Sequence, residues 1–271
     1  PERLLAALEA SVAGSAAGEL RPLTEKIPAL LALDEIVGSA PQFRAALAVA
    51  AKAARARVAV LIEGESGVGK EVVAEAVHAA SPRAKKPMLS VNCSALPANQ
   101  LDSELFGHET GAFAGAFDRK IGKFVEADGG TLFIDDIGEM PLETKARLLD
   151  TIQTGLVHPL GGRHPREVDV RVIVATSKRL VDEVEAGNFR EDLYFRLNIV
   201  PVTIPPLRER AQDIPALARH LLARIALQPG LRQLGITDDA LALLMDYDWP
   251  GNVRQLQNAL FRAAVLCEGD A

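Results

Sequence analysis

A glycine-rich segment between an apolar run and a helix pattern constrains this chain more than any other feature. It reads Gly64-Glu65-Ser66-Gly67-Val68-Gly69-Lys70 and fits the pattern G-x-x-x-x-G-K. Residues 58–62 before it predict a buried strand, and residues 71–80 after it predict a helix. In that context the backbone N–H groups and the helix N-terminus surround a phosphate, and the lysine reaches the β- and γ-phosphates. We therefore predict a phosphate-binding loop. A glycine turn beside a surface lysine is the alternative.

Four further apolar runs, at 88–91, 131–134, 170–175 and 199–204, read as strands buried on both faces. Helical patterns separate most of them, and residues 41–56 form another. This alternation predicts an α/β fold with a parallel five-stranded sheet flanked by helices. After 205–206 only helix patterns remain, at 212–227, 237–247 and 251–267. We expect an α/β nucleotide-binding unit at 34–206 and a small helical lid at 207–271.

Two neighbouring carboxylates follow the third apolar run, in Thr131-Leu132-Phe133-Ile134-Asp135-Asp136. Acids at the carboxyl end of a buried parallel strand lie beside the phosphate loop, where such sheets bind ligands. Asp135 is predicted to hold Mg²⁺ through water, and Asp136 to orient and polarise the attacking water. A helix cap is the other interpretation of two such aspartates.

Composition limits the class of protein. The net charge of −6 and pI near 5.5 argue against a stand-alone DNA-binding domain, so any DNA-reading element would lie outside this chain. Cys93 and Cys267 have no metal-ligand spacing. No apolar run approaches the roughly 20 residues that span a bilayer. We expect a cytoplasmic protein without a membrane segment.

A family resemblance rests on several longer runs. Residues 103–109 read SELFGHE and residues 111–116 read GAFAGA, which closely resemble the ELFGHE and GAFTGA signatures of the NtrC family. Runs at 189–197, 204–210 and 249–256 also match, and the resemblance covers about residues 34–268. The chain thus resembles the central AAA+ domain of bacterial sigma-54-dependent transcriptional activators, also called enhancer-binding proteins.

The resemblance implies an AAA+ P-loop ATPase that binds ATP or ADP with Mg²⁺ and assembles into a hexameric or heptameric ring. It implies that the motor remodels sigma-54 RNA polymerase, and that DNA contacts come only through a domain absent from this chain. The predicted contact with sigma-54 is a loop containing Gly111, Ala112, Phe113, Ala114, Gly115 and Ala116. A second loop, at 161–166, resembles its partner.

Individual site roles also follow from the resemblance. Asn92 matches the switch residue that relays nucleotide state to the water-activating acid. Arg190 and Arg196 match arginine fingers, which reach the γ-phosphate bound to the neighbouring subunit; the alternative is a surface helix with paired charges. Arg254 matches the sensor II arginine. The residues assigned to nucleotide contact are Val37, Gly38, Gly64, Glu65, Ser66, Gly67, Val68, Gly69, Lys70, Glu71, Asp135, Asp136, Ser177 and Arg254.

Four positions depart from the usual pattern. Glu71 stands where Ser or Thr usually binds magnesium, Ala114 replaces the threonine of GAFTGA, Asp136 replaces a glutamate and Ser177 replaces the sensor I asparagine. Three of them, Ala114, Asp136 and Ser177, lie on the route from γ-phosphate sensing to polymerase contact. They leave open an alternative function, a nucleotide-binding transcription regulator with weak or no ATPase activity that acts without sigma-54.

Residues 1–33 are predicted to be the end of a preceding helix followed by a linker. Leu4, Leu5, Leu8 and Val12 have helical spacing, and a glycine- and alanine-rich stretch follows them. This helix resembles the last helix of a response-regulator receiver domain. A two-component response regulator is therefore expected, in which phosphorylation controls ring assembly.

Overall fold

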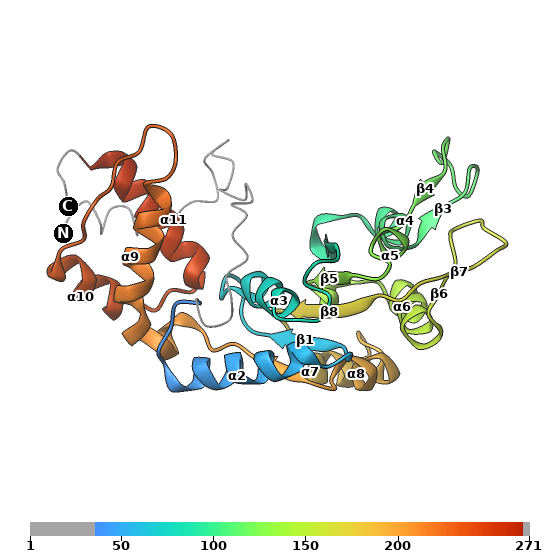
Figure 1. The fold of residues 1–271 in the computed structure, drawn as a ribbon, viewed down its shortest axis with the longest axis horizontal. Helices are drawn as coiled ribbons and strands as arrows, with labels where there is room; N and C mark the ends of the chain where they lie inside the picture. The colour runs from blue at the N-terminus through green and yellow to red at the C-terminus, as the bar shows by residue number, and fades with distance from the viewer. Residues whose placement is uncertain (1–35, 268–271) are drawn as a thin grey trace.

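The structure, a computed structural model, describes residues 36–267, except for the side chains of Ala98 and Asn99. The helix and linker predicted at 1–33 lie outside the described residues. The chain forms an α/β unit, a helical unit, and a pair of small hairpins that project at the far end from the helical unit (Figure 1).

The central sheet has five strands in the order β2 (Met88–Asn92), β5 (Thr131–Asp135), β8 (Arg171–Thr176), β1 (Val60–Glu63) and β9 (Pro201–Thr203). Every neighbouring pair is parallel. This confirms the predicted parallel five-stranded sheet. Parallel strands bring their carboxyl ends to one edge, so the segments after β1, β2, β5 and β8 meet there.

Burial differs between the strands, and here the sequence prediction was wrong for two of them. The inner strands β1, β5 and β8 are almost wholly buried. β9 alternates exposed and buried residues, and only Val91 of β2 is buried. The reason is their position: β2 and β9 are the sheet edges, and Pro201 has no N–H to donate to a further strand.

Helices cover both faces of the sheet. α2 (Pro41–Arg55) and α3 (Lys70–Ala79) pack on one face against Val60, Ile62 and Phe133. The other face, with Leu61 and Ile134, is covered by α4 (Ala98–Phe106), α5 (Lys123–Glu126), α6 (Leu142–Thr154), α7 (Leu180–Glu185) and α8 (Glu191–Leu197). Alternate residues of each inner strand therefore enter two separate cores.

The helical unit, hereafter the lid, has its own core. It comprises η3 (Leu207–Asp213), α9 (Ile214–Ile225), α10 (Asp238–Asp246) and α11 (Asn252–Leu266). Trp249 is fully buried, and its indole N–H donates to the Leu244 carbonyl at 2.7 Å. None of the helices in the described part of the chain is long and apolar enough to cross a membrane.

Two short hairpins hold the loops that the sequence analysis singled out. β3 (Gly107–His108) pairs with β4 (Lys120–Ile121), and β6 (Leu156–Val157) pairs with β7 (Arg166–Glu167). A bridge between His108 and Leu160 joins the two hairpins. Figure 1 shows them side by side, with the lid at the opposite end of the molecule.

Candidate functional site

The predicted phosphate loop lies between β1 and α3, at the carboxyl edge of the sheet. Gly69 directly precedes α3 with a left-handed backbone, φ 105°, which favours glycine. Lys70 is buried, and its ammonium donates to the carbonyls of Gly64 and Glu65 at 2.8 and 3.0 Å. Burial lowers the pKa of Lys70, while the charges of Asp135 and Asp136 oppose that shift. The lysine thus faces the two aspartates across the loop. Glu71 is exposed in the first turn of α3.

The lid packs directly on the phosphate loop. A Cβ added to Gly67 would lie 2.4 Å from the Gly251 carbonyl oxygen, so only glycine allows this approach. The backbone N–H of Arg254 donates to the Gly67 carbonyl at 3.2 Å. The Arg254 guanidinium donates to the Ser66 hydroxyl at 3.1 Å. The predicted lid arginine therefore contacts the phosphate loop.

Three lid residues that the sequence analysis gave no role also hold this loop. Arg208 makes a bidentate ion pair with Glu65, at 2.9 and 2.6 Å. Asn252 donates to the Glu65 carboxylate at 3.1 Å and to the Ser66 carbonyl at 3.0 Å. Arg210 donates to the Val68 carbonyl at 3.0 Å, and burial lowers its pKa to about 10. Arg208 and Arg210 lie in the run 204–210 and Asn252 lies in the run 249–256. Both runs match the family pattern, and this match was the signal in the sequence that could have identified them.

Val37 and Gly38, predicted to wall the adenine, lie at the junction of the lid and the α/β unit. Val37 packs against the lid core. A Cβ added to Gly38 would lie 2.4 Å from Phe43 of α2 and 3.0 Å from the lid residue Asp213. Asp213 also accepts from the backbone N–H of Ser39 at 2.6 Å.

Asp135 and Asp136 lie at the end of β5. Burial and the neighbouring charge of Asp136 raise the pKa of Asp135. Asp136 has a left-handed backbone, φ 51° and ψ 46°, a conformation that aspartate tolerates better than most residues. Crowded carboxylates of this kind suit a divalent cation, because it neutralises charge that burial leaves unfavourable.

No group of three or more His, Cys, Asp or Glu side chains in residues 36–267 forms a metal cage. Mg²⁺ is usually bound through one or two carboxylates together with water and substrate phosphates. Asp135 could supply one such carboxylate. Cys93 is four per cent exposed, and burial is the main cause that raises the pKa of its thiol to about 12.

A short hydrogen-bond chain connects the end of β2 to Asp136. The Asn92 amide N–H donates to Asp135 at 3.4 Å, so the predicted switch residue contacts the first aspartate. Ser94 connects Asn92 to Asp136: its hydroxyl lies 2.6 Å from Asn92 Oδ1 and 3.3 Å from Asp136 Oδ2. The Ser177 hydroxyl lies 3.4 Å from Asp136 Oδ1. Ser94 was not among the predicted site residues.

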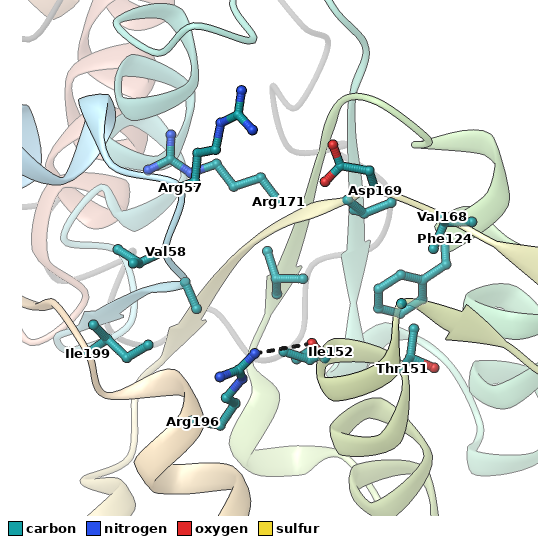
Figure 2. A pocket seen from close by; sticks show the side chains of 14 residues that line it. Arg57, Val58, Phe124, Thr151, Ile152, Val168, Asp169, Arg171, Arg196 and Ile199 are labelled. Atoms are coloured by element: carbon teal, nitrogen blue, oxygen red, sulfur yellow. Dashed lines mark hydrogen bonds between the residues drawn. The ribbon is translucent and has the colours of Figure 1, made fainter.

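One candidate arginine finger lies at the start of α8 and the other in its last turn. Arg190 directly precedes the helix, is exposed, and pairs with Asp192 at 2.7 Å. Arg196 lines a cavity of about 290 Å³ beside Val58 and Val170. In Figure 2 its guanidinium points toward Ile152, whose carbonyl it contacts at 3.4 Å. Val58 and Val170 precede β1 and β8, so Arg196 lies at the sheet edge opposite its own phosphate loop.

The 111–116 segment is a closed turn at the tip of the first hairpin. The Gly111 N–H donates to the Ala116 carbonyl at 2.8 Å. Phe113 is 40% exposed and packs edge-on against His108, with ring centroids 5.0 Å apart. Gly111, Ala114 and Gly115 are exposed, Ala112 is half-buried, and Ala116 is buried at the base of the turn.

Phe117, to which the sequence analysis gave no role, is 84% exposed directly after this turn. The second loop lies alongside: a Cβ added to Gly161 would lie 2.9 Å from the Ala112 side chain. The two loops therefore form one projection, on which the side chains of Phe113 and Phe117 are exposed.

Comparison with known families agrees with this arrangement. A family described as "Sigma-54 interaction domain" matches residues 36–203, and one described as "AAA+ ATPase lid domain" matches residues 208–271. The chain belongs to the sigma-54 interaction domain family. This sigma-54 interaction domain is 49% identical over 247 residues to a Nif-specific regulatory protein of Enterobacter agglomerans. It is 50% identical over 235 residues to the transcriptional regulatory protein ZraR of Escherichia coli K12.

The matches cover 91% and 87% of this chain but 48% and 53% of those two proteins. The sigma-54 interaction domain thus spans about half the length of these relatives. Among solved structures, it is similar to NtrX from Brucella abortus in complex with ATP, with a TM-score of 0.80 and 38% identity. That match covers 88% of this chain and 54% of the NtrX chain.

Proposed function

We propose that this chain is an ATP-hydrolysing ring motor that activates transcription by remodelling sigma-54 RNA polymerase. The observation that carries the proposal is the division of the site between two edges of the sheet. The phosphate loop, both aspartates and Arg254 meet at one edge, while Arg196 lies at the other. In a protomer built in this way, Arg196 would act on the nucleotide bound to a neighbouring subunit and not on the protomer's own nucleotide.

At the carboxyl edge, Lys70 and Arg254 would bind the phosphates, because both cations already contact the phosphate loop. Asp135 would hold Mg²⁺, which supplies charge neutralisation between the phosphates when bound. Asp136 would accept a hydrogen bond from the attacking water and orient it toward the γ-phosphate. Val37 and Gly38 would contact the adenine at the lid junction.

Arg196 at the opposite edge, and Arg190 at the exposed start of α8, would reach the nucleotide of the next subunit in a hexameric or heptameric ring. Negative charge spreads over the equatorial oxygens during phosphoryl transfer, and a guanidinium supplied in trans stabilises it. Both side chains are exposed in the single protomer, as such a role requires. Hydrolysis would then depend on assembly.

The projection formed by the loops 111–116 and 161–166 would engage sigma-54 through Phe113 when ATP is bound. A regulator that acts without sigma-54 is not favoured, because the matching family is defined by sigma-54 interaction and the curated relatives are regulators of about 50% identity. The domain limits 34–206 and 207–271, a bacterial cytoplasmic location, a preceding receiver domain and DNA contact through another domain belong to the same proposal.

Phosphate release measured across a range of protein concentrations tests the proposal. The rate per subunit should rise with concentration as rings assemble, and Arg190→Ala should lower it by on the order of 10³-fold. Arg179→Ala, an exposed arginine at the start of α7, is the matched control and should change the rate less than twofold. ATP binding without turnover in assembled protein would overturn the motor and favour a nucleotide-binding scaffold.

A further inference from the structure

We propose that Ser94 is a positioning residue for the water-activating acid: its hydroxyl donates to Asn92 in this structure and holds the Asp136 carboxylate when Asn92 turns away. This inference rests on the proposed function, since it assigns Asp136 to the attacking water. It adds a residue for which neither the loop motifs nor the acidic pair gave any signal.

The geometry gives Ser94 two competing acceptors. Its hydroxyl oxygen lies 2.6 Å from Asn92 Oδ1 and 3.3 Å from Asp136 Oδ2. A serine hydroxyl has one proton to donate. In this structure the short contact to Asn92 takes that proton. If Asn92 turns away, the same proton becomes available to Asp136, so the position of one amide decides whether the carboxylate is held.

Ser94 connects two side chains that share no hydrogen bond in this part of the structure, Asn92 and Asp136. Asp136 lacks one methylene relative to the glutamate of the family pattern, and the Asn92 amide N–H donates to Asp135 at 3.4 Å. Ser94 is the residue whose hydroxyl contacts both Asn92 and Asp136. Ser177 lies 3.4 Å from the other carboxylate oxygen of Asp136. Once the Ser94 proton is released from Asn92, each carboxylate oxygen of Asp136 has a hydroxyl donor nearby, and the two together would fix the plane of the carboxylate.

Removal of the Ser94 hydroxyl should leave the local fold intact. The turn η1 (Cys93–Ala95) is capped by Asn92 Oδ1, which accepts from the backbone N–H groups of Ser94 and Ala95 at 2.8 and 3.2 Å. Ser94→Ala keeps both of these bonds, and position 94 is exposed. Asn92→Ala would remove the cap as well, so Ser94→Ala is the sharper variant.

The test uses the whole 271-residue chain and two readouts, steady-state hydrolysis and the affinity for ADP with aluminium fluoride, a transition-state analogue. In Ser94→Ala we expect kcat to fall about five- to tenfold, the effect of one lost hydrogen bond, with KM unchanged. Affinity for the analogue should fall by the same factor and affinity for ADP should not. Ser94→Thr, which keeps the hydroxyl, and Ser90→Ala, an exposed serine of β2, should resemble the wild type.

A double variant distinguishes positioning from a general structural role. In an Asp136→Glu background the longer side chain should need Ser94 less, and Ser94→Ala should then change kcat less than about twofold. An equal loss in both backgrounds, or wild-type kcat and analogue affinity in Ser94→Ala, would overturn the inference while leaving the motor intact. A wild-type protein that neither hydrolyses ATP nor binds the analogue more tightly than ADP would overturn both proposals.

Discussion

At the scale of single residues, the site brings together charged groups whose charged forms are disfavoured by burial. Asp135 is half-buried beside Asp136, and Lys70 donates to the loop carbonyls of Gly64 and Glu65. Burial raises the pKa of Asp135 and lowers that of Lys70, so each charged form is disfavoured where it stands. A site of this kind gains stability when a cation and phosphates arrive, because they supply the missing partners.

Asp135→Asn should therefore stabilise the nucleotide-free protein while abolishing its response to Mg²⁺. The raised pKa means that the folded state binds more protons than the unfolded state in the window above the ordinary value of 3.8. The contribution of this group to stability thus grows as pH falls through the raised pKa and is lost as pH rises. The amide side chain carries no charge whose burial costs free energy, so we expect the melting temperature at pH 7.5 to rise by about 2 °C.

Thermal unfolding with and without Mg²⁺ and ATP checks this prediction. The wild type should gain stability from the two ligands together, and Asp135→Asn should gain none from the metal. Asp118→Asn removes an exposed carboxylate and is the matched control. A melting temperature that falls in Asp135→Asn would show that the carboxylate stabilises the empty fold.

At the scale of elements, the lid is attached to the phosphate loop by polar contacts of unequal burial. Asn252 is fully buried and joins Glu65 and Ser66, and it also accepts from the Leu207 backbone N–H at 2.7 Å. Arg208 makes an exposed ion pair with Glu65, which holds the pKa of that carboxyl below its usual value. The buried contact should dominate the stability of the lid, because exposed ion pairs contribute little.

Asn252→Ala should accordingly lower the free energy of unfolding by about 2–3 kcal/mol, since it leaves buried polar groups without partners. Arg208→Ala should lower it by less than about 1 kcal/mol. Its effect should instead appear in nucleotide affinity, because the phosphate loop loses one of its lid contacts. Urea unfolding and nucleotide titration measure the two quantities, and equal losses of stability would contradict this ranking.

The paired hairpins are a second element with a separable role. Phe113 and Phe117 are exposed on them, and both lie outside the three hydrophobic cores. Phe113→Ala and Phe117→Ala should each weaken nucleotide-dependent binding to sigma-54 by at least tenfold, as loss of an aromatic anchor does at an interface. ATPase activity without sigma-54 should stay within about twofold, since the phosphate loop is unchanged.

Co-sedimentation of the motor with sigma-54 in the presence of ADP and aluminium fluoride measures this binding. Phe195 of α8 is 66% exposed. Phe195→Ala tests whether the loss of any exposed aromatic side chain weakens binding to sigma-54. Full binding by Phe117→Ala would restrict the contact to the Phe113 turn.

At the scale of the whole molecule, the proposed catalytic parts are divided between the two edges of the sheet. If each seam of the ring joins Asp136 of one subunit to Arg196 of the next, two inactive variants that each lack one of these residues should restore activity to each other when they are mixed. Arg196→Ala and Asp136→Asn should each be nearly inactive alone. In an equal random mixture, about a quarter of the seams combine an intact arginine with an intact acid, so activity should return in part. Mixtures no more active than the two separate variants would place both residues in one site.

The sequence alone determined the five strands of the central sheet in their order along the chain, the phosphate loop and the acidic pair. These features depend on residues close together in the chain: a run of Val, Ile and Leu for an inner strand, and glycines before Lys70 for the loop. The same local reasoning predicted the lid as helices, and the structure agrees in each of the three segments.

Only the tertiary structure decided which strands lie at the edges of the sheet and which lid residues bind the phosphate loop. It alone also placed Ser94 between Asn92 and Asp136. Glu65 and Arg208 are 143 positions apart, and Ser94 and Asp136 are 42 apart. Local periodicity reports which face of an element is buried, but it carries no information on which distant side chain lies opposite. A serine hydroxyl or a surface arginine acquires a role only when folding brings its partner within hydrogen-bond distance.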